Sequence, residues 1–223
     1  HFEPEARMSV LKPRRIVITA GPTLEAIDPV RFLSNRSSGK QGYAIAEVLA
    51  QRGGDVVLIS GPTCLDAPEC VTRIGVESAR DMFDAVENAL PADVFIAVAA
   101  VADWRPETTS SLKADKADAH GILKLVQNPD ILHAISNRIE NRPALVVGFA
   151  AETHDVLSRA RAKRARKGCD WLLANDVSGD AMGGADNEII LITDTEETHW
   201  PRCAKSKIAA RLADALEAKL SKA

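Results

Sequence analysis

The sequence predicts an α/β fold: a mostly parallel, doubly wound sheet with helices on both faces. Two observations support this. Continuous apolar runs are typical of strands that are buried on both sides, and stretches with helical spacing of apolar residues separate them. Because crossovers between parallel strands are right-handed, this alternation favours a Rossmann-like architecture. The expected strands are 15–19, 55–60, one starting at 93, 144–152, 170–175 and 187–193.

Helices are expected in the intervals between these strands and at the end of the chain. Ser78 is a possible N-cap, and Gly168 follows the last residue of another helical stretch. In the last stretch, apolar residues recur every four positions and form one stripe. The expected helices are 40–52, 78–90, 156–167 and a C-terminal helix that carries Ile208, Leu212, Leu216 and Leu220.

Composition narrows the class of protein. The 223 residues suffice for one large domain or two small ones, and the net charge of −3 does not favour a nucleic-acid partner. The four cysteines form no CxxC pair, which indicates reduced thiols in a cytoplasm. The five histidines are scattered, so zinc is not expected, and no apolar run approaches the ~20 residues of a membrane span. We expect residues 1–14 to be a disordered or added end and residues 15–223 to form a single domain.

Two connections are much longer than the typical ~4–6 residues. The first lies between the opening strand and the helix at Lys40, and the second follows Asp103, with a possible short strand at Ile122–Val126. Loops of this length are often functional lids, so we predict a flap at about 104–120.

The first long connection, GPTLEAIDPVRFLSNRSSGKQG, is typical of an anion site. Gly21 allows a sharp turn. Ser37, Ser38 and Gly39 can donate hydrogen bonds, helped by the start of the following helix. Positive charge comes from Arg31, Arg36 and Lys40. It is not a P-loop, because Gln41 follows Gly39-Lys40. For Gly39-Lys40 alone, an ordinary helix start explains the pattern equally well.

The second long connection, AAVADWRPETTSSLKADK, offers small residues and charges. Ala99, Ala100 and Ala102 would let a base or ribose lie against the backbone. Asp103 could hold a metal or a ribose hydroxyl, and Lys113 and Lys116 could reach a triphosphate. The alternative is a solvated Lys/Asp loop.

Two further motifs have an ordinary reading beside a functional one. In NPDIL, Pro129 starts a helix with Asp130 in its first turn, or the segment forms the rim of a nucleobase site. RARAKRARK is a solvated face, a nucleic-acid stripe, or a phosphate cradle made by Lys163 and Lys167.

A dehydrogenase is the main competing interpretation. The spacing of Gly39, Gly42 and Ala46 is similar to that of short-chain dehydrogenases. Those enzymes need a Tyr-x-x-x-Lys pair, but Glu47 stands four residues after Tyr43, the only tyrosine. The turn after the first strand also lacks GxGxxG.

From Arg15 onward the chain resembles the phosphopantothenoylcysteine synthetase family, the ligase part of a bacterial bifunctional coenzyme A biosynthesis flavoprotein. Five segments carry the resemblance, in order and with matching gaps. They are ITAGPTLEAIDPVRFLSNRSSGKQG, AAVADWRP, NPDIL, VVGFAAET and KRARKGCDWLLANDV.

The resemblance implies a reaction and its partners. CTP would activate 4′-phosphopantothenate as an acyl-cytidylate, and cysteine would then form the amide and release CMP. It also implies Mg²⁺, a cytoplasmic homodimer whose flap completes the neighbour's site, and a small β extension for dimerisation. The strand around Ile189 to Ile192 and the Gly-rich loop before it are candidates for this interface, but their pattern would also suit a plain sheet edge. The flavin-dependent decarboxylase that usually precedes this domain is missing here. We therefore expect no FMN, no nucleic acid and no membrane, and a partner domain that is fused or assembled.

The resemblance also implies roles for individual residues. Asn35 would contact the activated acyl group, Arg31 would act in the cysteine step, and Lys113 would be the flap lysine. Asp103 would bind nucleotide through Mg²⁺. The flap reads KADK where the family has a denser basic cluster, which puts the role of Lys116 in question. The remaining nucleotide-binding residues would be Gly21, Ser37, Ser38, Gly39, Ala99, Ala100, Asn128, Pro129, Asp130, Ile131, Phe149, Lys163 and Lys167. An NAD(P)-binding oxidoreductase and a non-catalytic nucleotide-binding module remain the alternatives.

Overall fold

A computed structural model describes residues 11, 14–113, 122–152, 154–176, 184 and 186–222. Within this part of the chain, eight strands form one sheet in the order β12-β11-β10-β9-β6-β1-β4-β5. The strands are β1 (Arg15–Ala20), β4 (Asp55–Ser60), β5 (Val71–Gly75), β6 (Val94–Ala97), β9 (Leu145–Glu152), β10 (Trp171–Asp176), β11 (Asp186–Ile192) and β12 (Glu197–Ala204).

Six neighbouring strands, from β5 to β10, are parallel, and β11 and β12 extend the sheet in antiparallel fashion. Numbered along the chain, the parallel strands have the spatial order 3-2-1-4-5-6 of the doubly wound dinucleotide-binding fold. The order reverses between β1 and β6. In such sheets, ligands bind beyond the carboxyl ends of the strands at this switch point.

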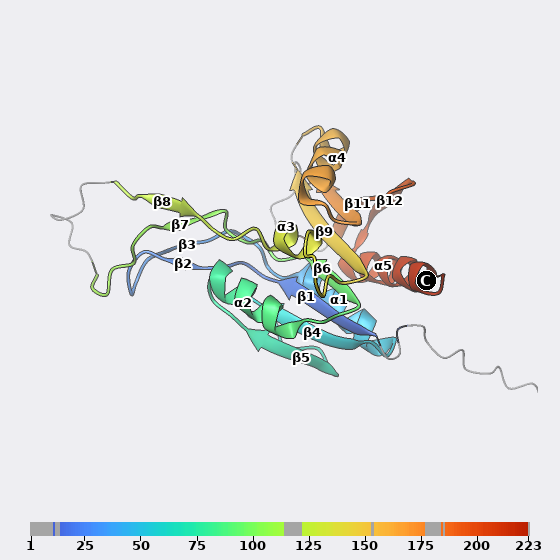
Figure 1. The fold of residues 1–223 in the computed structure, drawn as a ribbon, viewed down its shortest axis with the longest axis horizontal. Helices are drawn as coiled ribbons and strands as arrows, with labels where there is room; N and C mark the ends of the chain where they lie inside the picture. Colours follow the sequence, from blue (N-terminus) through green and yellow to red (C-terminus); the bar gives the residue numbers. More distant parts are fainter. Residues whose placement is uncertain are drawn as a thin grey trace, which may run out of the picture.

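Helices cover both faces of the sheet (Figure 1). On one face, α1 (Lys40–Gln51) and α5 (Lys205–Leu220) pack against apolar residues such as Ile16 and Ile18. The other face is covered by α2 (Ala79–Ala89), α3 (Ile131–Ser136) and α4 (Val156–Lys167), against residues such as Val17. Alternate residues of β1 therefore serve two cores, which is why its sequence is apolar throughout.

Glycine permits the close approach of α1 to the first strand. A Cβ added at Gly42 would lie 2.6 Å from the Cβ of Ala20. Because β1 leads directly into the loop before α1, this contact fixes where the start of the helix lies relative to the end of the strand.

Two short ribbons project from the body and form what we call the arm, residues 22–36 together with 101–113 and 122–128 (Figure 1). In one ribbon β2 (Glu25–Ala26) pairs with β3 (Phe32–Leu33), and in the other β7 (Trp104–Pro106) pairs with β8 (Leu125–Gln127). Hydrogen bonds join the two ribbons, among them one from Ser110 N to Ile27 O at 3.0 Å.

The structure confirms the predicted fold class and the predicted main elements. Ser78 caps α2 in a reciprocal capping box with Asp81, and Gly168 ends α4 with a left-handed backbone at φ 76°. All four cysteines are free. No helix in the described ranges combines the length and apolar character that crossing a membrane requires. Leu11 is fully buried in the first core.

Two expectations were wrong. Helix α3 begins at Ile131 and not at Pro129: the carboxylate of Asp130 caps the helix by accepting from His133 N, so Pro129 and Asp130 both lie before its first turn. Strand β11, which contains Ile189 to Ile192, is not a plain sheet edge, and its role in dimerisation stays a prediction. It lies between β10 and β12, and Ile189 is fully buried. Strand β12, whose exposed, polar residues gave no apolar signal, covers that side.

Candidate functional site

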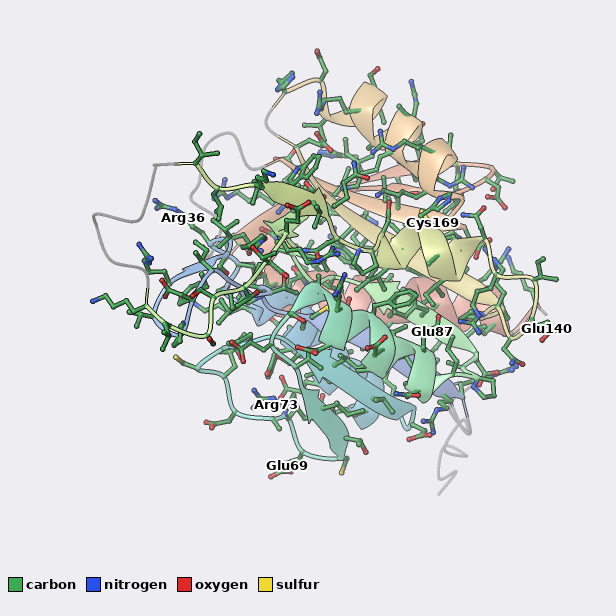
Figure 2. All side chains as sticks on the ribbon, turned by 60° about the vertical axis from the view of Figure 1, so that its left-hand side comes forward. Arg36, Glu69, Arg73, Glu87, Glu140 and Cys169 are labelled. Carbon is green, nitrogen blue, oxygen red and sulfur yellow. The ribbon has the colours of Figure 1, made fainter. Side chains whose placement is uncertain are left out.

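Two adjoining cavities lie at the carboxyl edge of the sheet, around the switch point between β1 and β6. Their volumes are about 470 and 430 Å³. In the view of Figure 2, Arg36 and Glu140 lie on opposite sides of the molecule. Arg36 belongs to the loop before α1, and Glu140 to the loop between α3 and β9. The residues shared by both cavities are Ala99, Val101, Asp103, Phe149 and Lys163.

The first cavity lies at the start of α1. Gly39, the N-cap residue, has a left-handed backbone at φ 74°, and no side chain caps the helix. The first amides of α1 therefore remain available to an anion. The predicted residues that line this cavity are Gly21, Ser37, Ser38, Gly39, Ala99, Ala100, Asp103, Phe149 and Lys163.

Asn35 joins the two loops that border the switch point. Its Nδ2 donates to Ala100 O at 2.5 Å, and its Oδ1 accepts from Ser37 N at 3.0 Å. The side chain lines neither cavity. It holds the serine-rich loop against the loop after β6, and one of its amide hydrogens remains for a ligand.

The second cavity lies beneath the start of α3. Asn128 is fixed by three hydrogen bonds. Its Nδ2 donates to Ala102 O at 2.8 Å, its backbone N donates to Asp103 O at 2.9 Å, and its Oδ1 accepts from Arg105 Nη1 at 3.2 Å. The predicted residues that line this cavity are Ala99, Asp103, Asn128, Pro129, Asp130, Ile131, Phe149, Lys163 and Lys167.

Asp130 and Lys167 form an ion pair at the rim of the second cavity. Burial favours the neutral carboxyl, but hydrogen bonds from the Lys167 ammonium and from His133 N–H hold the pKa of Asp130 below its ordinary value. The pair presents a fixed carboxylate and a fixed cation beside each other. The carboxylate can accept a hydrogen bond from a ligand hydroxyl at this rim, and the ammonium can pair with a ligand phosphate.

Lys163 lies where the two cavities meet. Burial lowers the pKa of its ammonium, an effect that Glu152 opposes and that the Lys167 charge reinforces. The group stands in less water than an ordinary surface lysine. Its attraction to an incoming anion is stronger for the same reason.

Asp103 fits a magnesium site of the kind that nucleotides complete. Its carboxylate lines both cavities. Among the described residues, no cluster of three or more His, Cys, Asp or Glu side chains could hold a metal ion. Magnesium in nucleotide sites is commonly held by one or two carboxylates together with phosphate oxygens, so a single Asp103 is consistent with that arrangement.

Three predicted catalytic residues, Asn35, Arg31 and Lys113, lie outside the lining of both cavities. Arg31 and Lys113 belong to the arm. Arg31 is held by Asp28, whose fully buried carboxylate accepts from Arg31 Nε at 2.8 Å and from Nη2 at 2.5 Å. Lys113 is exposed, and Lys116 lies outside the described residues.

Sequence reasoning missed the far wall of the first cavity. This wall is formed by the starts of α1 and α5 and by the ends of β10 to β12, and it contains Lys40, Gln41, Asn175, Asp186, Asn187, Glu188, Arg202 and Lys205. Lys40, Gln41 and Asn175 belonged to recognised motifs, and Asn187 and Glu188 to a predicted strand. Arg202 and Lys205 depend on the unpredicted strand β12, which carries the chain back to the carboxyl edge before α5 begins.

The basic run on α4 does not form a free cationic stripe. Arg159 pairs with Glu152 at 2.6 Å, Arg161 with Glu197 at 2.6 Å, and Arg164 with Asp194. Acidic residues from the sheet and its loops therefore balance this helix, and Lys163 and Lys167 turn to the cavities.

Comparisons with known proteins agree with the fold and the order of the motifs. Residues 11–220 match the family model described as the DNA/pantothenate metabolism flavoprotein C-terminal domain. A "Coenzyme A biosynthesis bifunctional protein CoaBC" of Vibrio vulnificus is 47% identical over 210 residues, which is 92% of this chain and 49% of that protein. The protein of the same name from Escherichia coli K12 is 45% identical over 195 residues, which is 85% of this chain and 47% of that protein. The chain thus spans about half the length of these curated relatives.

Solved structures extend the likeness. The crystal structure of the C-terminal domain of a coenzyme A biosynthesis bifunctional protein CoaBC aligns with a TM-score of 0.80 and 38% identity, over 94% of this chain and 97% of the other. A Cab2 mutant in complex with phosphopantothenate-cysteine aligns with a TM-score of 0.72 over 94% of this chain and 88% of the other. At 14% identity this second likeness concerns the fold alone.

Proposed function

This chain belongs to the family of the DNA/pantothenate metabolism flavoprotein C-terminal domain, and from that premise we propose that it is a CTP-dependent phosphopantothenate–cysteine ligase of coenzyme A biosynthesis. The carboxylate of 4′-phosphopantothenate attacks the α-phosphorus of CTP and expels pyrophosphate. The amine of cysteine then attacks the acyl carbon of the cytidylate, loses a proton and releases CMP.

One observation carries the proposal. Two joined cavities lie at the switch point of the sheet, and their walls contain every nucleotide-binding residue that the sequence motifs suggested except Lys113. A nucleotide and a second substrate can therefore meet at the shared wall around Asp103, Phe149 and Lys163. Bringing a poor electrophile and its activator together is how such sites gain most of their rate.

The residues divide the work in this reaction. Lys163 and the open amides at the start of α1 stabilise charge on the phosphates. Asn35 holds the loop that carries Ser37 against the loop after β6, and its remaining amide hydrogen would donate to the acyl oxygen of a substrate that extends beyond the lining of the cavities. Magnesium, held by Asp103 and the phosphates, would supply neutralisation of the triphosphate charge.

The arm supports a homodimer as the working form. Exposed large apolar side chains gather there, and apolar surface of this kind marks interaction sites. Arg31 and Lys113 lie on the same arm, outside the cavities, so a second copy would bring them to the neighbour's site. The exposed apolar residues of the arm are Val30, Phe32, Trp104, Leu112, Ile122, Leu123 and Leu125.

The length of the relatives supports a further partner. They are about twice as long as this chain and are named bifunctional. A flavin-dependent decarboxylase, fused or assembled, would act beside this ligase and would hold the FMN. The four free cysteines are consistent with work in a reducing cytoplasm.

A direct assay tests the function. The purified chain is incubated with Mg²⁺, 4′-phosphopantothenate and each nucleoside triphosphate in turn, and released pyrophosphate is measured. CTP is expected to give pyrophosphate without cysteine and CMP only after cysteine is added. A folded dimer that releases no pyrophosphate with any of the triphosphates would overturn the proposal and leave a non-catalytic nucleotide-binding module.

The oxidoreductase alternative finds no support at the site. The hydroxyl of Tyr43 forms hydrogen bonds with Ser60 Oγ at 2.9 Å and Thr63 Oγ1 at 3.1 Å, and the residue lines neither cavity. Tyr43 is 5% exposed. It therefore serves the core rather than hydride transfer.

A further inference from the structure

Two helices begin at the far wall of the first cavity. Strand β12 runs parallel to β10, because each is antiparallel to β11. The start of α5 therefore lies at the same carboxyl edge as the start of α1. The first residues of the two helices, Lys40 and Lys205, both line this cavity.

Both helix starts depart from the usual chemistry of an N-terminus. Neither α1 nor α5 has a side-chain cap, and neither has an acidic residue in its first turn. In contrast, Ser78 and Asp81 cap α2, and Asp130 caps α3. A lysine at the first position adds positive charge to the positive end of the helix, which is unfavourable unless an anion lies nearby.

The charges of Lys40 and Lys205 repel each other at this wall. Burial lowers the pKa of Lys205, and the charge of Lys40 lowers it further, whereas Asp186 opposes the shift. The Lys205 ammonium also donates to Gly184 O at 2.5 Å. It is thus held at the wall of the cavity rather than extended into water.

A chain of amides holds the two helix starts together. Asn175 Nδ2 donates to Asn187 Oδ1 at 3.3 Å, and Asn187 Nδ2 donates to Gln41 Oε1 at 3.1 Å. Gln41 Nε2 then donates to Lys205 O at 3.2 Å. The first turn of α1 is therefore tied to the first residue of α5, and the cationic wall is preorganised.

We propose that the starts of α1 and α5, with Lys40 and Lys205, form a phosphoryl-binding subsite at the far end of the first cavity. Two lysines and two helix ends, each worth roughly half a charge, supply about three positive charges, and Asp186 offsets one of them. The remaining charge suits a phosphoryl dianion better than a single carboxylate. Arg202 and Glu188 line the same wall with opposite charges and roughly offset each other.

This inference rests on the proposed function for the identity of its ligand. Two phosphoryl groups of the reaction could occupy the subsite: the β,γ-phosphates of CTP, which leave as pyrophosphate, or the 4′-phosphate of phosphopantothenate. Their chemistry is shared, and binding experiments separate them because each ligand has a counterpart without that group.

The test compares Lys205→Met and Lys40→Met with the unchanged chain by calorimetry. CTP is paired with CMP, phosphopantothenate with pantothenate, and inorganic pyrophosphate is titrated alone. Loss of a charge-assisted contact to phosphate is expected to weaken binding of the phosphorylated member of one pair roughly 10- to 100-fold and to change its counterpart little. If CTP and pyrophosphate bind more weakly and CMP does not, the phosphates of the nucleotide occupy the subsite. If phosphopantothenate binds more weakly and pantothenate does not, its 4′-phosphate occupies the subsite.

Lys207→Met is the matched control. Lys207 is exposed in the first turn of the same helix and does not line the cavity, so its removal should leave all of these affinities unchanged. Melting temperatures without ligand separate binding from folding. Because Lys205→Met removes a cation from a helix start, its melting temperature should be no lower than that of the unchanged chain.

Three results would overturn the subsite: equal effects of Lys205→Met and Lys207→Met, equal weakening of both members of a pair, or a change confined to the concentration dependence on cysteine. The calorimetric readouts require no turnover, and only the dependence on cysteine concentration comes from the assay of the reaction. A chain that binds CTP more tightly than CMP through Lys205 but releases no pyrophosphate would keep the subsite and refute the ligase. A chain that makes the amide but is indifferent to Lys40 and Lys205 would do the reverse.

Discussion

The sheet and the arm obtain their order in different ways. Strand β1 pairs with β4 at six successive positions, and its side chains are buried in two cores. The pairing of β2 with β3 covers two positions and that of β7 with β8 three. Isolated ribbons of this size are marginal in water. The arm therefore depends on its polar connections to the body and on whatever covers its apolar side chains.

This contrast indicates a division of tasks. The carboxyl ends of the strands fix much of the cavity walls through backbone geometry, and the base of the arm adds residues such as Asp103 and Asn128. The arm carries Arg31 and Lys113, which lie outside the cavities, and it leaves Phe32 and Trp104 exposed at 54% and 48%. Stability and catalysis should consequently respond differently to changes in the two regions.

The largest effect is expected at the junction of the two regions. A Cβ at Gly61, directly after β4, would lie 1.6 Å from the backbone oxygen of Pro22, where the arm begins. Gly61→Ala must displace that backbone, and we expect the free energy of unfolding to fall by about 3 kcal/mol, the upper part of the range for overpacking. Urea unfolding measures it. Gly75→Ala is the control, because nothing lies within 4 Å of the added atom, and a similar loss there would refute the steric explanation.

Asn35 connects the arm to the loop after β6, and its change should affect chemistry more than folding. Asn35→Ala removes the bonds to Ala100 and Ser37 and the remaining amide donor. We expect pyrophosphate release to fall about 100-fold, as for loss of one preorganised donor. Unfolding should change by only about 1 kcal/mol. Full activity, or failure to fold, would contradict the assignment.

The third prediction concerns the surface of the arm. Phe32→Asp places a charge on an exposed aromatic position and should weaken dimerisation about 30-fold, in keeping with a buried aromatic anchor of about 2 kcal/mol. Sedimentation velocity over a range of concentrations gives the dissociation constant. Ile139→Asp is matched in chemistry but lies outside the arm and is fully exposed at 100%. If both variants dimerise alike, the arm is not the interface.

The fourth prediction concerns the ion pair within the arm, in which the Asp28 carboxylate is buried and the Arg31 side chain is 48% exposed. The hydrogen bond from the Arg31 side chain, opposed by burial and helped by Val30 N–H and Arg31 N–H, lowers the pKa of Asp28 from 3.8 to about 2. Because the folded pKa is depressed, the stabilisation is complete above the unfolded pKa and is lost as pH falls from about 4 through 2.

Carboxyl NMR of Asp28 and unfolding curves at each pH check this. The stability difference between the unchanged chain and Asp28→Asn should shrink across that window. A difference that stays constant from pH 5 to pH 2 would mean that the carboxylate is not responsible.

The same contrast explains what could be predicted from the sequence. Strands such as β1 and β4 were predictable because they are continuous apolar runs. Helix α4 begins and ends at the predicted residues Val156 and Lys167. Strand β12 has few buried residues, and β2 and β7 are two and three residues long. Their pairing depends on partners distant in the chain, which local patterns do not encode.

At the site, motif residues adjacent to strand ends were predictable because parallel strands bring their carboxyl ends together. Lys205 was not, because its place depends on β12. The bond between Asn35 and Ala100 was not predictable either. It joins residues 65 positions apart, and a polar loop gives no sign of which carbonyl its amide will reach.

The smallest effect is expected on the sheet side, at an ion pair that contrasts with Asp28–Arg31. Arg159 is half exposed and pairs with Glu152 at 2.6 Å. When Arg159 is removed, the Glu152 carboxylate still interacts with the positive charge of Lys163. Arg159→Ala should therefore lower the free energy of unfolding by only about 0.5 kcal/mol, and less at high salt. Urea unfolding at two salt concentrations measures it. A much larger loss that salt does not reduce would mean that α4 depends on this pair for its position, and the contrast between a self-sufficient sheet and a dependent arm would need revision.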